Sequence, residues 1–213
     1  MDHQGLRLDG VRIALGPRVL IAISHVVAPG AVLTIMGPSG SGKSTLLAYV
    51  GGFLDKAFTA SGRVLAGDLD LTALAPQERH VGILFQDPLL FPHMSVAGNL
   101  RFAIPQAVKG RAAREALAEE ALAGVDLAGM GARDPDTLSG GQKARVALAR
   151  VLVSSPRALL LDEPFSKLDA DLRLQMRELV FSKARAGGLP VILVTHDEAD
   201  AAAAGGPIAR IGA

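Results

Sequence analysis

The chain has 213 residues, of which 49% are hydrophobic, and this suits one domain with a sizeable buried core. The formal net charge is +1 and basic residues are scattered among acidic ones, which excludes an electrostatic basis for nucleic-acid binding. Cysteine is absent, which excludes disulfides and thiolate metal sites.

The N-terminal part predicts β-structure. Residues Leu6–Ala14 and Val19–Val27 read as two strands around a turn at Gly16 and Pro17. The first residues lack a basic segment followed by an apolar core, so we expect no signal peptide. Residues 19–41 carry no formal charge and are long enough for a membrane span, but Pro29-Gly30 break the run, and two buried strands explain it better.

A glycine-rich segment then follows a short apolar strand, Ala31–Met36, and precedes a helical pattern. It matches the phosphate-binding pattern G-x-x-x-x-G-K-[ST] in the strand-to-helix context that this motif requires. Backbone N–H groups there would form an anion nest at a helix N-terminus. Lys43 would reach the β and γ phosphates, and Ser44 would hold Mg²⁺. The predicted nucleotide-binding residues are Gly37, Pro38, Ser39, Gly40, Ser41, Gly42, Lys43, Ser44 and Thr45.

The motif alone does not separate GTPases, kinases and motor ATPases. Further along the chain we predict strands at Gly62–Ala66, Val81–Phe85, Ala158–Leu161 and Pro190–Thr195, an amphipathic helix at Arg111–Leu122 and a long helix at Ala170–Ala186. Alternation of strands and helices at both ends predicts an α/β fold with a parallel core sheet and covering helices. The whole chain would be one domain, with a core of residues 1–86 and 154–213 and a helical insertion at 87–153.

Two carboxylates end the buried strand at 158–161. Asp162 and Glu163 lie at its carboxyl end, where ligands bind in open α/β sheets. Asp162 is predicted to hold Mg²⁺, and Glu163 to orient and deprotonate the attacking water. His196 ends the other late strand, so its ring is predicted to meet the γ-phosphate at the same sheet edge.

The segment Leu138–Gln142 opens a helix with Ser139 as a good N-cap. Glycines just inside that end leave backbone N–H groups bare, which predicts a second anion site made by Ser139, Gly140, Gly141 and Gln142. One chain then carries two surfaces for a γ-phosphate. A two-fold dimer, in which each chain completes the other's site, is the economical arrangement.

These motifs together resemble the ABC-transporter ATPase family, over almost the whole chain from about Leu6 to Ile211. The motifs occur along the sequence in the same order as in that family. They are the phosphate loop, Gln86, the segment at 138–142, the acidic motif at 158–163, the loop 166–169 and His196. The resemblance implies an α/β fold of the P-loop NTPase (RecA-like) class, with a mostly parallel core sheet, an N-terminal antiparallel β subdomain and an inserted helical subdomain. It also implies ATP and Mg²⁺ as cofactors. It implies that Gln86 senses Mg²⁺ and water, with a catalytic role and a place in the metal shell. It also implies that Asp169 lies in a dimer-contacting loop beside the nucleotide.

The resemblance further implies a homodimer that powers solute import through integral membrane permease subunits, with an extracytoplasmic solute-binding protein as an indirect partner. The chain would lie at the cytoplasmic face of the bacterial inner membrane. The stretch 86–100 resembles the surface that docks a permease coupling helix, with Leu89, Leu90, Phe91 and Met94 as exposed apolar residues. Since the chain stops soon after His196, we expect a short form without a C-terminal regulatory domain.

Two positions depart from the family pattern. The family often stacks adenine on an aromatic residue near the second strand. The comparable position here is Leu15 or a neighbour, none of which is aromatic, and Tyr49 lies beyond the phosphate loop. Acceptance of GTP is therefore left open. Lys167 stands where a small residue is frequent and is expected to alter the dimer contact.

Other functions known in this family would require a different domain organisation of the chain or a different transport direction. A DNA-repair ATPase of this family would need a long coiled coil between the phosphate loop and residue 138, and the sequence has none. A ribosome-regulating module would usually carry two cassettes in one chain. Export remains the closest rival to import, and a binding-protein gene beside this one would separate the two.

Overall fold

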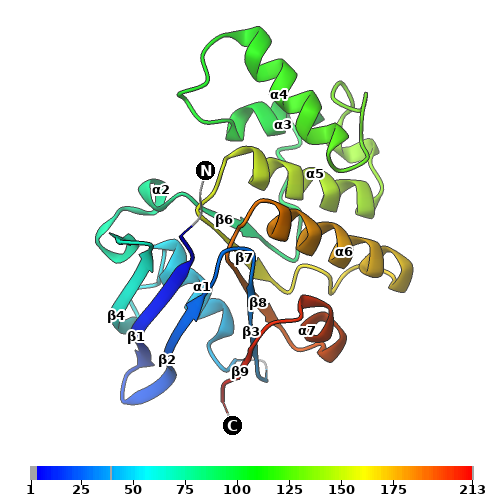
Figure 1. The fold of residues 1–213 in the computed structure, drawn as a ribbon. Coiled ribbons are helices and arrows are strands. Elements are labelled where there is room, and N and C mark those ends of the chain that lie inside the picture. The colour runs from blue at the N-terminus through cyan, green and yellow to red at the C-terminus, as the bar shows by residue number, and fades with distance from the viewer. Residues whose placement is uncertain (1–3, 39, 213) are drawn as a thin grey trace. The chain divides into compact units, whose positions relative to one another are not determined.

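Two sheets and their helices form the first of two structural units in the computed structural model, which describes residues 4–38 and 40–212 (Figure 1). Unit 1 comprises the chain up to Ile83, Arg157–Glu163 and the chain from Phe181 onward. Unit 2 comprises Leu84–Pro156 and Pro164–Val180. The contacts thus group residues 164–180 with the helical part of the chain.

The antiparallel sheet of unit 1 has the order β2-β1-β4-β5. Its strands are β1 (Leu6–Leu15), β2 (Arg18–Val27), β4 (Phe58–Ala66) and β5 (Leu69–Asp70). Strand β1 alternates buried and exposed side chains along most of its length, as expected for a sheet with one face on a core. Its last residue, Leu15, pairs with Arg18 on one side and with Phe58 on the other.

The second sheet has the order β6-β7-β8-β3-β9. Its strands are β3 (Val32–Met36), β6 (Val81–Leu84), β7 (Ala158–Asp162), β8 (Val191–Thr195) and β9 (Ile208–Arg210). Strands β7, β8, β3 and β9 pair in parallel. Strands β3 and β8 are buried along their whole length, because a parallel sheet is covered on both faces.

One apolar core joins both sheets and the helix α1 (Lys43–Gly51), which lies between them in Figure 1. Leu46, Leu47 and Val50 are the buried apolar side chains that α1 supplies to this core. The remaining elements of unit 1 are η1 (Leu71–Ala73), α2 (Pro76–Arg79) and α7 (Glu198–Ala204). The core thereby fixes α1, and with it the loop at its N-terminus.

Unit 2 is helical. It contains α3 (Val96–Ala103), α4 (Arg111–Ala123), η2 (Pro135–Thr137) and α5 (Gly140–Val153), and α6 (Ala170–Ala186) begins in it. The first three α-helices pack on one another through buried residues such as Leu100, Leu122 and Val146. Arg114 donates to the carbonyls of residues 101, 104, 105 and 108, so it satisfies the end of α3 and does not belong to a merely solvated face.

The predicted α/β class with parallel and antiparallel sheets is confirmed. Strands β5 and β9 and helix α2 were not predicted, since each is four residues or shorter and leaves little periodic signal. Within residues 4–38 and 40–212, the search for a helix of the length and hydropathy that a membrane span needs found none.

Candidate nucleotide site

The phosphate loop joins β3 to α1 in unit 1. Gly42, the N-cap of α1, has φ of 95°, a left-handed conformation that L side chains rarely adopt. A Cβ there would also lie 3.1 Å from the Cβ of Leu20. Glycine is therefore required at this turn, which leaves the helix N-terminus without a side chain over its N–H groups. Ser39, predicted in this loop, lies outside the described residues.

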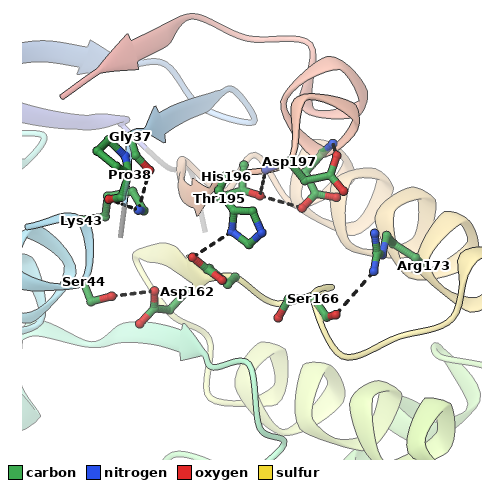
Figure 2. Close-up of polar contacts among 12 residues, drawn as sticks. Gly37, Pro38, Lys43, Ser44, Asp162, Ser166, Arg173, Thr195, His196 and Asp197 are labelled. Atoms are coloured by element: carbon green, nitrogen blue, oxygen red, sulfur yellow. Dashed lines mark hydrogen bonds and ion pairs between the residues drawn. The ribbon is translucent and has the colours of Figure 1, made fainter. Parts of the chain in front are cut away.

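Lys43 is the first residue of α1 and only 6% exposed. Its Nζ donates to the carbonyl oxygens of Gly37 at 2.7 Å and Pro38 at 2.9 Å, as Figure 2 shows. These bonds hold the ammonium group against the carbonyls at the start of the loop, and Lys43 also lines the cavity beside the loop. An ammonium group has three N–H donors, so this geometry suits a phosphate oxygen as the further acceptor.

Ser44 and Asp162 approach each other from α1 and the end of β7. The Ser44 hydroxyl donates to Asp162 Oδ1 at 3.0 Å (Figure 2). Burial raises the pKa of Asp162, the Ser44 hydrogen bond opposes that rise, and Glu163 adds to it. An ionised Asp162 is thus costly here without a cation, and a hydroxyl beside a carboxylate is the oxygen donor set that Mg²⁺ accepts.

A Mg²⁺ ion at this position would need further oxygen ligands, supplied by the phosphates of a bound nucleotide or by water. The described residues contain no group of three or more His, Cys, Asp or Glu side chains that could hold a metal by themselves. This agrees with the usual Mg²⁺ site, in which one or two protein ligands are completed by phosphate oxygens and water.

Glu163 and His196 meet at the carboxyl edge of the parallel sheet. The Nδ1 of His196 lies 3.2 Å from Oε1 of Glu163. Glu163 has φ of +47°, a left-handed conformation that costs about 1 kcal/mol for a non-glycine residue. Its N–H donates to the carbonyl of Val194 at 2.9 Å, which helps to hold that conformation. Strain of this kind is common where a side chain must point at a substrate.

Hydrogen bonds to buried polar groups hold the loop that carries His196 in place. The Thr195 hydroxyl donates to Asp200 Oδ2 at 2.8 Å, and both residues are at most 3% exposed. The N–H of Asp197 in turn donates to Thr195 Oγ1 at 3.0 Å (Figure 2). Asp197 also caps α7. His196 therefore stands between two anchored neighbours. Sequence reasoning missed Asp200, although its place four residues after the histidine was a usable signal.

A cavity of about 460 Å³ opens beside the phosphate loop in unit 1. Its lining includes loop and helix residues 40 and 42–45 together with Glu163. The other lining residues are Leu15, Arg18 and Leu20 from the first two strands and Phe58 from β4. Phe58 was not predicted, because only the pairing of β4 with β1 brings it to this place. Tyr49 is engaged elsewhere, since its hydroxyl donates to the carbonyl of Gly62 at 2.8 Å.

Unit 2 holds the second predicted anion site. Ser139 is the N-cap of α5, and it forms a reciprocal capping box with Gln142 at 3.0 and 3.3 Å. A Cβ on Gly141 would lie 2.6 Å from Leu172, so this position is filled by packing. A Cβ on Gly140 would meet no described atom within 4 Å beyond its own neighbours. Gly140 is therefore the more open of the two.

Gln86 and Gly140 line one apolar cavity of about 180 Å³ within unit 2, and Leu168 from the predicted dimer-contacting loop lines it too. The structure thus brings these three predicted segments together. Lys167 forms an exposed ion pair with Asp87, with 2.5 Å between Nζ and Oδ1. Asp169 accepts a hydrogen bond from the N–H of Leu172 at 2.9 Å at the start of α6.

The segment after Gln86 is braced from inside unit 2. Asn99 is fully buried, and its amide bonds both the N–H and the carbonyl of Phe91. Arg150 of α5 donates to the carbonyls of Pro88 and Leu89 at 3.0 and 2.8 Å, and its guanidinium lies 5.4 Å from the centre of the Phe91 ring. Helix α5, which begins at Gly140, therefore supports this segment directly.

The predicted exposure of this segment is partly wrong. Leu89 is 57% exposed, but Leu90, Phe91 and Met94 are half-buried because they pack within unit 2. Phe102, which was not predicted, is 66% exposed and meets Phe91 edge to face at 5.0 Å. Leu89 and Phe102 are thus two exposed apolar side chains at or near this segment. Phe85 and Leu174 are also exposed in unit 2.

A parallel sheet with a phosphate loop between β3 and α1, and carboxylates at the end of β7, defines a P-loop nucleoside triphosphatase. Comparison with known proteins narrows this class. The profile of the ABC transporter family matches residues 20–166, and the chain belongs to this family. It is an ATP-binding ATPase.

Three relatives show the range of named functions. The uncharacterized ABC transporter ATP-binding protein YnjD of Escherichia coli is 48% identical over 86% of this chain and 84% of its own length. The thiamine import ATP-binding protein ThiQ of Cereibacter sphaeroides is 45% identical over 92% of this chain and 83% of its own. The Fe(3+) ions import ATP-binding protein FbpC of Agrobacterium fabrum is 42% identical, and the match covers 92% of this chain but 55% of that protein.

Proposed function

We propose that two copies of the chain close over two molecules of Mg-ATP, and that closing and reopening drive solute import through membrane permease subunits. The observation that carries the proposal is the ordered edge of unit 1, where Lys43, the Ser44–Asp162 pair and the Glu163–His196 pair all lie. The open N-terminus at Gly140 supports the second half of the composite site. The names of ThiQ and FbpC support import.

In this mechanism the phosphate loop and Lys43 bind the β and γ phosphates. Ser44 and Asp162, with Gln86 as a further ligand and water sensor, would hold the Mg²⁺. Bound there, Mg²⁺ would neutralise charge on the β and γ oxygens. Asp169 is proposed to contact the nucleotide from the dimer-contacting loop. Catalysis then consists of positioning and electrostatic stabilisation.

Glu163 takes a proton from the attacking water as that water's oxygen bonds to the γ-phosphorus. The bond between the γ-phosphorus and the bridging oxygen breaks, and ADP leaves with the electron pair. His196 donates a hydrogen bond to a γ-phosphate oxygen and stays oriented by Thr195 and its contact with Glu163. Loss of the γ-phosphate removes the group that both copies hold, so the dimer reopens.

The chain is proposed to sit at the cytoplasmic face of the bacterial inner membrane, attached through the permease and without nucleic acid. An extracytoplasmic solute-binding protein would deliver the solute, and specificity would reside in that protein and the permease. Tagged chain from solubilised membranes of its host should co-purify with a permease subunit. ATP-driven uptake into vesicles holding that complex would support import, and ATP-driven efflux would assign export.

Changing Ser139→Arg should prevent dimer closure, because a bulky cation would replace the cap at the proposed contact with the partner's ATP. On a sizing column with ATP, the variant should run as a monomer while its ATP affinity stays near that of the wild type. Ala132→Arg, at an exposed position of the same unit, is the matched control and should still dimerise. Dimers of the Ser139→Arg protein that persist with ATP would contradict the composite site.

Replacing both Leu89 and Phe102 by Asp should uncouple the permease, because charge would replace two exposed apolar side chains at the proposed docking segment. Solute uptake should fall at least about tenfold, while basal ATP hydrolysis by the isolated chain is unchanged. Val26→Asp changes an apolar side chain that is 65% exposed in unit 1 and should leave uptake intact. Normal uptake by the double variant would show that the permease docks elsewhere.

A further inference from the structure

The cavity beside the phosphate loop is lined at one end by the loop and α1 and at the other end by side chains of the antiparallel sheet. The loop and α1 supply backbone N–H groups and Lys43, which suit the phosphates of a nucleotide. The nucleoside must then extend toward the other lining residues, which are Leu15, Arg18, Leu20 and Phe58. Apart from the arginine these side chains are apolar. Base binding must therefore rely on stacking and apolar contact, with Arg18 as the polar exception.

Phe58 is the one aromatic side chain among the described residues that line this cavity. It is half-buried and packs against the apolar core of unit 1, so its ring is held by its surroundings. The register of the antiparallel sheet sets Leu15 between Arg18 and Phe58. Three neighbouring strand ends thus present an aliphatic, a cationic and an aromatic side chain side by side.

Arg18 bears on which base is accepted. A guanidinium group offers only donors, and these suit acceptors on a base edge. Guanine presents two such acceptors, O6 and N7, whereas adenine presents N7 beside an amino donor. No side chain at this end of the cavity is an acceptor that would favour the adenine amino group, among the residues that the structure describes.

We propose that Phe58 is the base-stacking residue of the nucleotide site and that the chain binds and hydrolyses GTP as well as ATP. Phe58 on β4 supplies the aromatic surface, and the aliphatic Leu15 lies beside it at the end of β1. Arg18 can donate a hydrogen bond to either purine, and it favours guanine where its N–H groups reach the base edge. This inference rests on the phosphates lying in the loop at Lys43.

Calorimetry with Mg²⁺ present separates the two ends of the site, because inorganic tripolyphosphate has no base. Phe58→Ala should weaken both ATP and GTP about tenfold or more, the loss expected for removing a base–aromatic stack. Tripolyphosphate should bind the variant as it binds the wild type. Phe58→Tyr should restore nucleotide affinity. Phe53→Ala removes another phenylalanine of unit 1, 48% exposed and outside the cavity lining, and should change nothing.

Arg18→Gln tests base preference and should lower GTP affinity more than ATP affinity. In the wild type, the affinities for the two nucleotides should agree within about fivefold, and GTP should be hydrolysed. A wild type that binds ATP at least about a hundredfold better than GTP would overturn the selectivity claim. An equal loss of tripolyphosphate and ATP binding in Phe58→Ala would overturn the stacking claim. If the wild type bound no tripolyphosphate, the assignment of the loop would fail instead.

Discussion

Glu163→Gln is expected to lower the rate of ATP hydrolysis by about three orders of magnitude, because the amide cannot take the proton of the attacking water. ATP binding should persist, since the phosphate loop, Lys43 and the Ser44–Asp162 pair are untouched. The change keeps the shape of the side chain, so its contact with His196 can be kept as well. Single-turnover hydrolysis and equilibrium binding of ATP measure the two effects separately.

The same variant should accumulate as an ATP-bound dimer, because the step that reopens the dimer is blocked. Glu198→Gln makes the same chemical change at an exposed glutamate that pairs with Arg210, and it should hydrolyse ATP normally. If Glu163→Gln turned over ATP at a near-normal rate, the carboxylate would not be the base. If the variant hydrolysed ATP at a normal rate but formed no ATP-bound dimer, Glu163 would be needed for dimer formation and not as the base.

Lys43→Ala is expected to reduce ATP affinity at least about a hundredfold. The change removes a buried cation that is proposed to bind the phosphates, and charge-assisted hydrogen bonds contribute more than neutral ones. It also takes away the donor that the carbonyls of Gly37 and Pro38 share, so the loop loses its internal support. Titration calorimetry with ATP is the measurement.

A folding defect would mimic this result, so the thermal unfolding midpoint must be compared as well. Lys43→Met keeps most of the apolar stem while removing the charge, and it should lose ATP binding to a similar degree. Lys56→Ala, at an exposed lysine of the same unit, should bind ATP like the wild type. Unchanged ATP binding by a well-folded Lys43→Met protein would refute the role of this lysine.

Local sequence patterns were sufficient to predict the strand and the helix on either side of the phosphate loop. The buried run at 32–36 and the helix from Lys43 were predictable because each is continuous in sequence and bounded by glycine. Helix α6 occupies the predicted residues 170–186. The roles assigned to residues of both units remain predictions. The grouping of 164–180 with the helical unit was not foreseen, because contacts between distant segments decide it.

The parts of the site that escaped sequence reasoning depend on tertiary pairing. Phe58 lies 43 positions from Leu15 in the chain, and only the register of β1 with β4 makes them neighbours. The half-buried state of Phe91 depends on Arg150 of α5 and Phe102 of α3, which contact its ring from these two helices. The resemblance to a docking surface predicted exposed apolar side chains there, whereas some of them are half-buried by packing inside the helical unit.

The central claim is that ATP is held by two copies, with the phosphate loop from one and the Ser139 segment from the other. Mixing Lys43→Ala chains with Ser139→Arg chains measures this directly, because a mixed dimer would contain one site with both surfaces intact. We predict that each variant alone is inactive and that the equimolar mixture recovers about a quarter of wild-type ATP hydrolysis. A mixture no more active than its separate components, in a sample where mixed dimers are demonstrated, would contradict the claim.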